Sequence, residues 1–391
     1  MPGRTSNGAL CPLRGLATAT IATIAVFAFA PALAGQANLS TQGFGYPTGQ
    51  LSSRALGSAG SIGEVDPLSP INPASLADLP TRTVFFQIEP EFRTVTANGG
   101  TDHTTTARYP VVFGAIPVGS RWVASLSAST LLDRTSTTTF TSTQPLSSTE
   151  SVGMTTKYQI DGAMNDVRLG AGWAPVRWLR VGVGAHAITG HNRVNVTQTF
   201  ADTVAFSAFS QTRVLSFSGG AASVGLELVS KTFTAAASAR RGGTVRMTSE
   251  DTVLSHGNVP TRYGMSLSYT GLANSFFSIR TSRDEWSSLG SLGEPGLRGV
   301  DAWDTSVGAD VAGPRVFGRI VFVRAGYRDR TLPFEAAGHE VGEKSVTGGL
   351  GTTFANSRIL TDLAVIRASR SASIDASEHA WSISLGFSVR P

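Results

Sequence analysis

The sequence is poor in cysteine and in charged residues, and beyond residue 34 it contains no long apolar run. Cys11 is the only cysteine, so the rest of the chain uses neither disulfides nor thiolate metal ligands. Only 15% of the residues are charged, whereas about a quarter is usual in soluble domains. Because about 18 consecutive apolar residues are needed, the chain after residue 34 cannot form a membrane-spanning helix.

The first 34 residues have the pattern of an export signal. Arg4 and Arg14 form a positively charged region, residues 15–30 are apolar and uncharged, and Ala32-Leu33-Ala34 fits a cleavage site. The apolar run is short for a membrane anchor. We therefore predict a cleaved signal peptide over residues 1–34.

Charge and motifs exclude several classes of function. The net charge of +5 is small for 391 residues and gives no reason to expect a nucleic-acid partner. The six histidines are scattered, and His186 and His191 have opposite strand parity; we expect neither a metal site nor a cofactor. Nucleophile-elbow and phosphate-loop motifs are absent, which favours a protein that is not an enzyme. A serine and a histidine on adjacent strands would escape this search.

Alternation with a period of two residues is the main structural signal. In the last predicted strand, Trp381, Ile383, Leu385, Phe387 and Val389 alternate with small or polar residues. A strand places all five on one face, whereas a helix would scatter them around its axis. A weakly charged chain with apolar residues at every second position suits a lipid-facing barrel.

Counting such segments gives about fourteen strands, an even number as in bacterial outer-membrane barrels. The expected spans are 81–96, 106–118, 121–134, 153–175, 178–200, 212–229, 233–249, 261–271, 275–287, 302–313, 315–330, 343–356, 358–373 and 379–390. The predicted fold class is therefore all-β, a transmembrane antiparallel β-barrel of about fourteen strands with a short N-terminal plug segment.

Connection lengths support this count. Every second connection is tight, and those between are longer and polar. The long ones are 135–152, 251–260, 289–301 and 331–342. Short turns on one rim and long loops on the other are typical of outer-membrane barrels. A soluble β-sandwich stays an alternative, since it too alternates, but it usually has a more charged exterior.

Residues 35–80 do not alternate and are rich in Gly, Ser, Pro and Ala. The stretch 53–60, then Asp66-Pro67, then Ile71-Asn72-Pro73-Ala74-Ser75-Leu76-Ala77 follow in that order. This order resembles the N-terminal signature of the FadL/TodX family of outer-membrane hydrophobic-compound transporters and of PorV-like relatives. The hairpin from Asn165 to Trp178 is also similar to the family's periplasmic hairpin.

The resemblance implies three parts of the chain: a signal peptide (1–34), a plug-like segment (35–80) and an outer-membrane barrel (81–391). A barrel of this strand number encloses a lumen wider than its own side chains fill, so a compact plug has a physical purpose. The alternative is that Asn72-Pro73-Ala74 is only the turn before the first strand. The residues expected to form the plug motif are Arg54, Gly57, Asp66, Asn72, Pro73 and Ala74.

Strand parity also points several residues into the lumen. Arg324 and Arg328 fall on the face opposite the apolar one, as do many other charges. One interpretation is that these charges pair with each other and with the plug. The other is that Arg324 or Arg328 binds the carboxylate of an amphipathic ligand. Ile320 and Phe322 share the inward parity, and with Phe276 they would contact its tail.

The FadL/TodX resemblance implies passive uptake of hydrophobic or amphipathic small molecules, of the long-chain fatty-acid kind, across the outer membrane of a Gram-negative-type envelope. The expected partners are outer-membrane lipid, the hydrophobic ligand and the barrel assembly machinery. Two alternatives stay open: a structural, partner-binding barrel of the PorV kind, and a general hydrophilic porin. A sealed lumen favours the first alternative, and an open charged constriction favours the second.

Overall fold

The structure is a computed structural model. It describes residues 41, 43–97, 100–145, 151–202, 205–290, 292, 298–336, 338–372 and 376–391. The predicted signal peptide, residues 1–34, lies outside the described residues. Within the described ranges, no helix has the length and apolarity that a membrane crossing requires.

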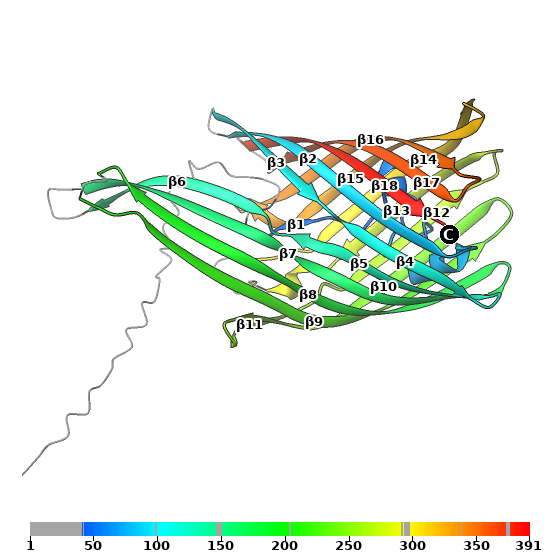
Figure 1. Ribbon diagram of the computed structural model, residues 1–391, viewed down its shortest axis with the longest axis horizontal. Coiled ribbons are helices and arrows are strands. Elements are labelled where there is room, and N and C mark those ends of the chain that lie inside the picture. The colour runs from blue at the N-terminus through cyan, green and yellow to red at the C-terminus, as the bar shows by residue number, and fades with distance from the viewer. Residues whose placement is uncertain are drawn as a thin grey trace, which may run out of the picture. The chain divides into compact units, whose positions relative to one another are not determined.

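The chain forms a closed antiparallel β-barrel of 14 strands, which confirms the predicted fold class. Neighbouring strands in the sequence pair in order, and the last strand closes the ring by pairing with the first (Figure 1). We call the end of the barrel that carries the tight turns after every second strand, and the C-terminus, the turn end. The opposite end is the loop end.

Eleven of the fourteen barrel strands are single strand elements. They are β2 (Thr83–Ala97), β7 (Ser151–Val176), β8 (Leu179–Phe200), β9 (Phe209–Val229), β10 (Phe233–Ser249), β13 (Ser275–Asp284), β14 (Ala302–Val316), β15 (Arg319–Ala336), β16 (His339–Phe354), β17 (Ile359–Ser371) and β18 (Ala376–Val389).

The other three barrel strands are each interrupted once, into the consecutive pieces β3 and β4, β5 and β6, and β11 and β12. Their bounds are β3 (Gly100–Arg108), β4 (Val111–Val118), β5 (Trp122–Asp133), β6 (Ser136–Pro145), β11 (Thr252–Asn258) and β12 (Arg262–Tyr269). Pro110 and Pro260 stand at two of the interruptions, where the missing backbone N–H prevents continuous pairing.

The predicted long loops at 135–152, 251–260 and 331–342 are wrong in large part, because the strands continue through them. β6 pairs with the first half of β7, from Ser136 opposite Ile160 to Pro145 opposite Ser151. In Figure 1 this part of the sheet projects beyond the rest of the barrel. Such threonine-rich extensions are polar on both faces, so they carry no alternating signal although threonine favours strands. The predicted loop 289–301 lies partly outside the described residues.

The barrel wall has an apolar exterior, as the alternation predicted, and its inner face is small or polar toward the turn end. In β18, Trp381 is 48% exposed and Phe387 43% exposed, whereas Ser384 and Ser388, of the opposite parity, are fully buried. Trp122 and Trp173 stack on the outside at the turn end, with ring centroids 5.2 Å apart. Aromatic rings at that level suit the lipid–water interface.

Residues 43–80, which we call the plug, lie inside the barrel. The plug contains β1 (Tyr46–Pro47), the helix α1 (Ser53–Gly57) and the 3-10 helix η1 (Pro73–Asp78). β1 pairs with β5, α1 contacts β15 to β18, and η1 contacts β5 and β7 to β9. Blue ribbon within the barrel in Figure 1 shows this placement.

Short-range hydrogen bonds fix the two plug helices. The Ser52 hydroxyl accepts from Ala55 N at 3.1 Å and donates to the Asp66 carboxylate, which also accepts from Ser69 Oγ at 2.7 Å. Asn72 caps η1 in the same way, accepting from Ala74 N at 3.0 Å. A capping oxygen followed by Pro73 at the first helical position is a favourable helix start.

Glycine on the inner face makes room for the plug. Gly182 of β8 and Gly225 of β9 lie directly against η1, where a Cβ atom would overlap Pro73 or Asn72. Gly57 of α1 likewise lies close to Gly349 of β16, with its ideal Cβ position 3.2 Å from that backbone. The plug therefore packs on backbone rather than on side chains at these points.

Candidate functional site

A large part of the lumen at the loop end is lined by apolar residues. Twenty-one buried residues form one cluster there, which we call the apolar chamber; they come from the wall, from the first part of the plug and from the connection between β13 and β14, which contains the 3-10 helix η2 (Trp286–Leu289). Phe44 of the plug is fully buried in it, edge-on to Trp286 at 6.1 Å between ring centroids and 6.5 Å from Phe334. The members are Phe44, Tyr46, Leu131, Leu132, Ile160, Met164, Ile188, Val194, Leu215, Phe217, Val245, Met247, Val259, Trp286, Leu289, Leu292, Ala302, Leu332, Phe334, Ala336 and Val341.

At the edge of the chamber, the aromatic ring of Tyr46 in the plug is surrounded by arginines. The guanidinium carbons of Arg108, Arg330 and Arg370 lie 4.4, 4.8 and 4.8 Å from the centroid of the Tyr46 ring. The Tyr46 hydroxyl also donates to Glu343 at 3.1 Å. Each cation–π contact of this kind is worth about 0.5 to 2 kcal/mol, so the ring anchors the start of the plug.

Glu64 anchors the middle of the plug to the wall. Its carboxylate accepts from Arg262 at 2.5 Å and from Ser238 at 2.7 Å, and it lies 3.5 Å from Arg280. Burial alone would raise the pKa of Glu64, but the charges of Arg262 and Arg280 and the hydrogen bonds hold it below its usual value. Glu64 is therefore ionised at neutral pH and neutralises arginine charge in the wall.

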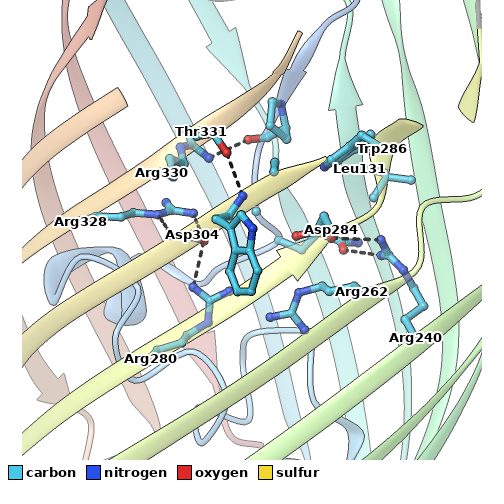
Figure 2. A pocket seen from close by; sticks show the side chains of 15 residues that line it. Leu131, Arg240, Arg262, Arg280, Asp284, Trp286, Asp304, Arg328, Arg330 and Thr331 are labelled. Carbon is cyan, nitrogen blue, oxygen red and sulfur yellow. Dashed lines mark hydrogen bonds and ion pairs between the residues drawn. The ribbon is translucent and has the colours of Figure 1, made fainter. Parts of the chain in front are cut away.

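A small cavity of about 40 Å³ lies where this network meets the apolar chamber. Figure 2 shows Arg280 and Arg328 on either side of Asp304, and Asp284 facing Arg240. The Asp304 carboxylate accepts from Arg328 at 2.7 Å and from Arg280 at 3.0 Å. The cavity is the size of one or two water molecules, too small for an organic ligand in this state.

The two arginines predicted to bind a ligand carboxylate are both in ion pairs. Arg324 lies 2.6 Å from Asp362 and 3.1 Å from Asp310, which also pairs with Arg54 of the plug. Arg328 pairs with Asp304. A ligand carboxylate would have to displace these partners. The interpretation that lumen charges pair with each other and with the plug fits these contacts, and carboxylate binding by Arg324 or Arg328 stays a prediction.

The three predicted tail contacts lie in different surroundings. Phe276 packs against the apolar core of the plug, and it lines a second cavity of about 130 Å³ with Ile62 and Asp78. Ile320 is 39% exposed beside the turn at 317–318, and Phe322 is half-buried. Their contact with a ligand tail stays a prediction.

Sequence reasoning missed a chain of hydrogen bonds on β7, β8 and β9. The His186 ring lies with Nδ1 2.8 Å from the Asp166 carboxylate and Nε2 2.8 Å from Ser223 Oγ. Gln50 of the plug donates to the same carboxylate at 3.0 Å. The three wall residues all have inward parity, but the pairing of the three strands was needed to see that they meet. These hydrogen bonds connect the plug to the wall.

The interrupted strands leave a hollow of about 340 Å³ in the wall near the chamber. Tyr109, Thr130 and His191 line it together with the Arg108–Asp133 ion pair, at 2.7 Å. Groups of three or more His, Cys, Asp or Glu side chains arranged to hold a metal ion do not occur in the described ranges.

These observations define a class of protein: a transmembrane β-barrel whose lumen is apolar at the loop end and closed by an ion-paired plug. No protein-family profile and no curated protein sequence matches the chain. Solved structures match the fold. A FadL homologue from Pseudomonas aeruginosa superposes with a TM-score of 0.62 over 88% of this chain and 99% of its own, at 12% identity.

Two toluene transporters are similar in the same way. TbuX from Ralstonia pickettii has a TM-score of 0.56 at 14% identity, covering 88% of this chain and 98% of its own. TodX from Pseudomonas putida has a TM-score of 0.54 at 13% identity, covering 89% and 96%. The predicted resemblance to FadL/TodX is thereby confirmed for the fold.

Proposed function

We propose that the chain is an outer-membrane channel for passive uptake of hydrophobic or amphipathic small molecules, exported through a cleaved signal peptide and inserted by the barrel assembly machinery. In this proposal the turn end faces the periplasm. A ligand partitions into the apolar chamber, and movement of the plug releases it. Fatty-acid-like and monoaromatic molecules are the candidate cargo classes, the second suggested by the toluene transporters that share the fold.

The apolar chamber is the observation that carries the proposal. A channel for polar solutes needs a hydrated, charged lumen. Here twenty-one buried apolar residues gather at the loop end, and the side chain of Phe44 already occupies the position that an aromatic ligand would take between Trp286 and Phe334. Burial of an apolar ligand is worth roughly 25 cal/mol per Å², which is enough for capture without a dedicated polar contact.

The projecting sheet favours a second candidate, a barrel that tethers a partner protein. β6 and the adjoining part of β7 extend beyond the rest of the barrel in Figure 1, and most side chains of β6 are exposed. The apolar chamber has no purpose in that function. The two candidates therefore differ in whether the chamber binds small molecules.

Quenching of Trp286 by bromobenzene tests the proposal. Bromobenzene is titrated into the refolded barrel in detergent and into the Trp286→Phe variant. The other tryptophans are quenched by bromobenzene dissolved in the detergent. The difference between the two titrations is therefore the quenching of Trp286 in the chamber. Saturable quenching in this difference supports uptake of hydrophobic molecules. No saturable difference overturns it and leaves the partner-binding barrel.

A further inference from the structure

Arg168 of β7 differs from every other buried arginine in the described ranges. Its side chain points into the lumen and is 1% exposed, and none of its three nitrogens has a hydrogen-bond or ion-pair partner. The other buried arginines bind carboxylates, as Arg262 binds Glu64, or backbone carbonyls, as Arg134 binds Gly43 and Phe44.

Two serine hydroxyls beside Arg168 are also unpartnered. Ser127 of β5 lies opposite Arg168 in the strand register, and Ser125 lies opposite Gly170. The Oγ atoms of both are buried without a hydrogen-bond partner. The ideal Cβ position of Gly170 is 2.7 Å from Ser125 Oγ and 3.7 Å from Arg168 Nε. These donors therefore converge beside a glycine, which contributes no side chain of its own.

The nearest acidic residue, Asp166, forms no ion pair with Arg168. Asp166 accepts from His186 and Gln50 and lies 3.6 Å from Arg240, so its oxygens are engaged elsewhere. A buried guanidinium without a counter-charge is strongly unfavourable. Hydroxyl groups can stabilise an anion by donating to it, but they do not cancel the arginine charge. The group that fits this set of donors is therefore a small anion.

We propose that Arg168, Ser125 and Ser127 form a buried site for a small monovalent anion beneath the apolar chamber. The planar guanidinium matches a carboxylate in geometry and binds it through two parallel hydrogen bonds. The source is either the carboxylate of an amphipathic cargo molecule or a free halide ion. The first source rests on the proposed function, and the second does not.

The position of the site suits a cargo headgroup. Met164, Asp166 and Arg168 occupy successive inward positions on β7, and Met164 belongs to the apolar chamber. Four residues of strand separate Met164 from Arg168, about 13 Å by the usual rise. Leu76 of η1 covers the site, its Cδ1 atom 3.0 Å from the ideal Cβ position of Gly170. An anion there bridges the wall and the underside of the plug.

Thermal unfolding of the refolded barrel tests the site with three probes: sodium octanoate, sodium bromide and neutral 1-octanol. Proteins compared are the wild type, Arg168→Met, Ser125→Ala and, as a matched control, Arg177→Met in an exposed turn. We expect octanoate or bromide to raise the midpoint of the wild type and of Arg177→Met saturably. Ser125→Ala should raise the apparent dissociation constant of the anion roughly tenfold, and Arg168→Met should abolish the shift in the unfolding midpoint.

A merely structural arginine predicts a different result. Under our proposal, Arg168 has no counter-ion in buffer without octanoate or halide. Arg168→Met should then unfold at a higher temperature than the wild type, because an uncompensated charge is removed. A merely structural arginine would instead be destabilised by the same substitution. A response to octanoate alone assigns the site to the cargo headgroup. A response to bromide assigns it to small anions in general.

The inference is overturned if neither anion shifts the wild-type midpoint, or if Arg168→Met retains the full shift. 1-Octanol separates this failure from failure of the proposed function, since it has the chain but no charge. If 1-octanol raises the unfolding midpoint of both the wild type and Arg168→Met, the apolar chamber still binds hydrophobic molecules although the anion site does not exist.

Discussion

Two regions of the lumen are built on opposite principles, although β7, β10 and β15 contribute to both. In the apolar chamber, inward positions carry Leu, Ile, Val, Phe and Met, and Phe44 of the plug completes the cluster. Toward the turn end, inward positions carry arginine, acidic residues, serine and glycine, and the plug fills the space between them. Inward parity therefore does not by itself mean a polar position.

The difference has consequences for how each half opens. The chamber is held by dispersion and by exclusion of water, which do not depend on direction, so another apolar molecule can take the place of Phe44. The plug is held by ion pairs and close backbone contacts that have one geometry. We expect the chamber to exchange occupants readily and the plug to be either docked or released.

Removing the Glu64 charge should have the largest effect. Glu64→Gln leaves Arg262 and Arg280 without that carboxylate, and loss of one member of a buried pair costs about 3 to 5 kcal/mol. Docking of the plug should weaken by that amount, with ion conductance in planar bilayers as the readout. Glu340→Gln, at an exposed position, is the control and should stay closed. A closed Glu64→Gln barrel would mean that Glu64 does not hold the plug.

Acid should act on the same contact. Because the folded pKa of Glu64 lies below its usual value, the stability it contributes is present above that value and is lost as pH falls through the folded pKa. We therefore expect no opening at pH 7 and added conductance below about pH 4. Glu64→Gln should lack this added step.

Shortening the Phe44 side chain tests the apolar chamber rather than the ion-paired plug. Phe44→Ala should cost about 3 kcal/mol of unfolding free energy and create space between Trp286 and Phe334. Toluene should recover part of the loss, as measured by urea unfolding with and without toluene. Phe317→Ala, at a residue 98% exposed in a turn, should change neither quantity. Equal rescue of both variants would contradict binding in the chamber.

Filling the glycine contact under η1 should have a smaller effect. Gly225→Ala places a methyl group against Asn72 and should cost about 1 to 3 kcal/mol by overpacking. Protease sensitivity of the plug in folded barrels measures this. Gly348→Ala, where a Cβ atom has open space, provides the matched comparison. If the two variants are cut equally, the backbone contact is not what positions η1.

The smallest expected effect is at the start of α1. Ser52→Ala removes the side-chain cap on Ala55 and one partner of Asp66, for about 1 kcal/mol. The same protease assay reports it, with Ser230→Ala in an exposed turn as reference. An effect as large as that of Glu64→Gln would show that the cap, rather than the ion pairs, controls docking.

The barrel was predictable from the sequence because its signal is local. Alternation in the last strand identified the lipid-facing residues Trp381 and Phe387 and the inward serines between them, and it placed His186 and His191 on opposite faces. The polar strand extensions were missed for the same reason, since β6 and β11 do not alternate. Their strand character comes from pairing with β7 and β10.

The site was less predictable. The sequence indicated that Arg324, Arg328 and Arg168 all face inward, but it gave no way to tell that the first two have acidic partners on other strands while Arg168 has none. Phe44 and Tyr46 lie in a segment without periodicity, so nothing marked them as the residues that fill the chamber and anchor the plug.

The sequence by itself thus determined the strand number, the face of each strand and the presence of a non-alternating segment before the barrel, because a period of two is a property of neighbouring residues. Only the tertiary structure decided which inward charges are paired, where the lumen is apolar and why glycine occupies the wall under η1. Those features depend on strand register and on the path of the plug, which bring together residues up to 331 positions apart, such as Ser53 and Ser384.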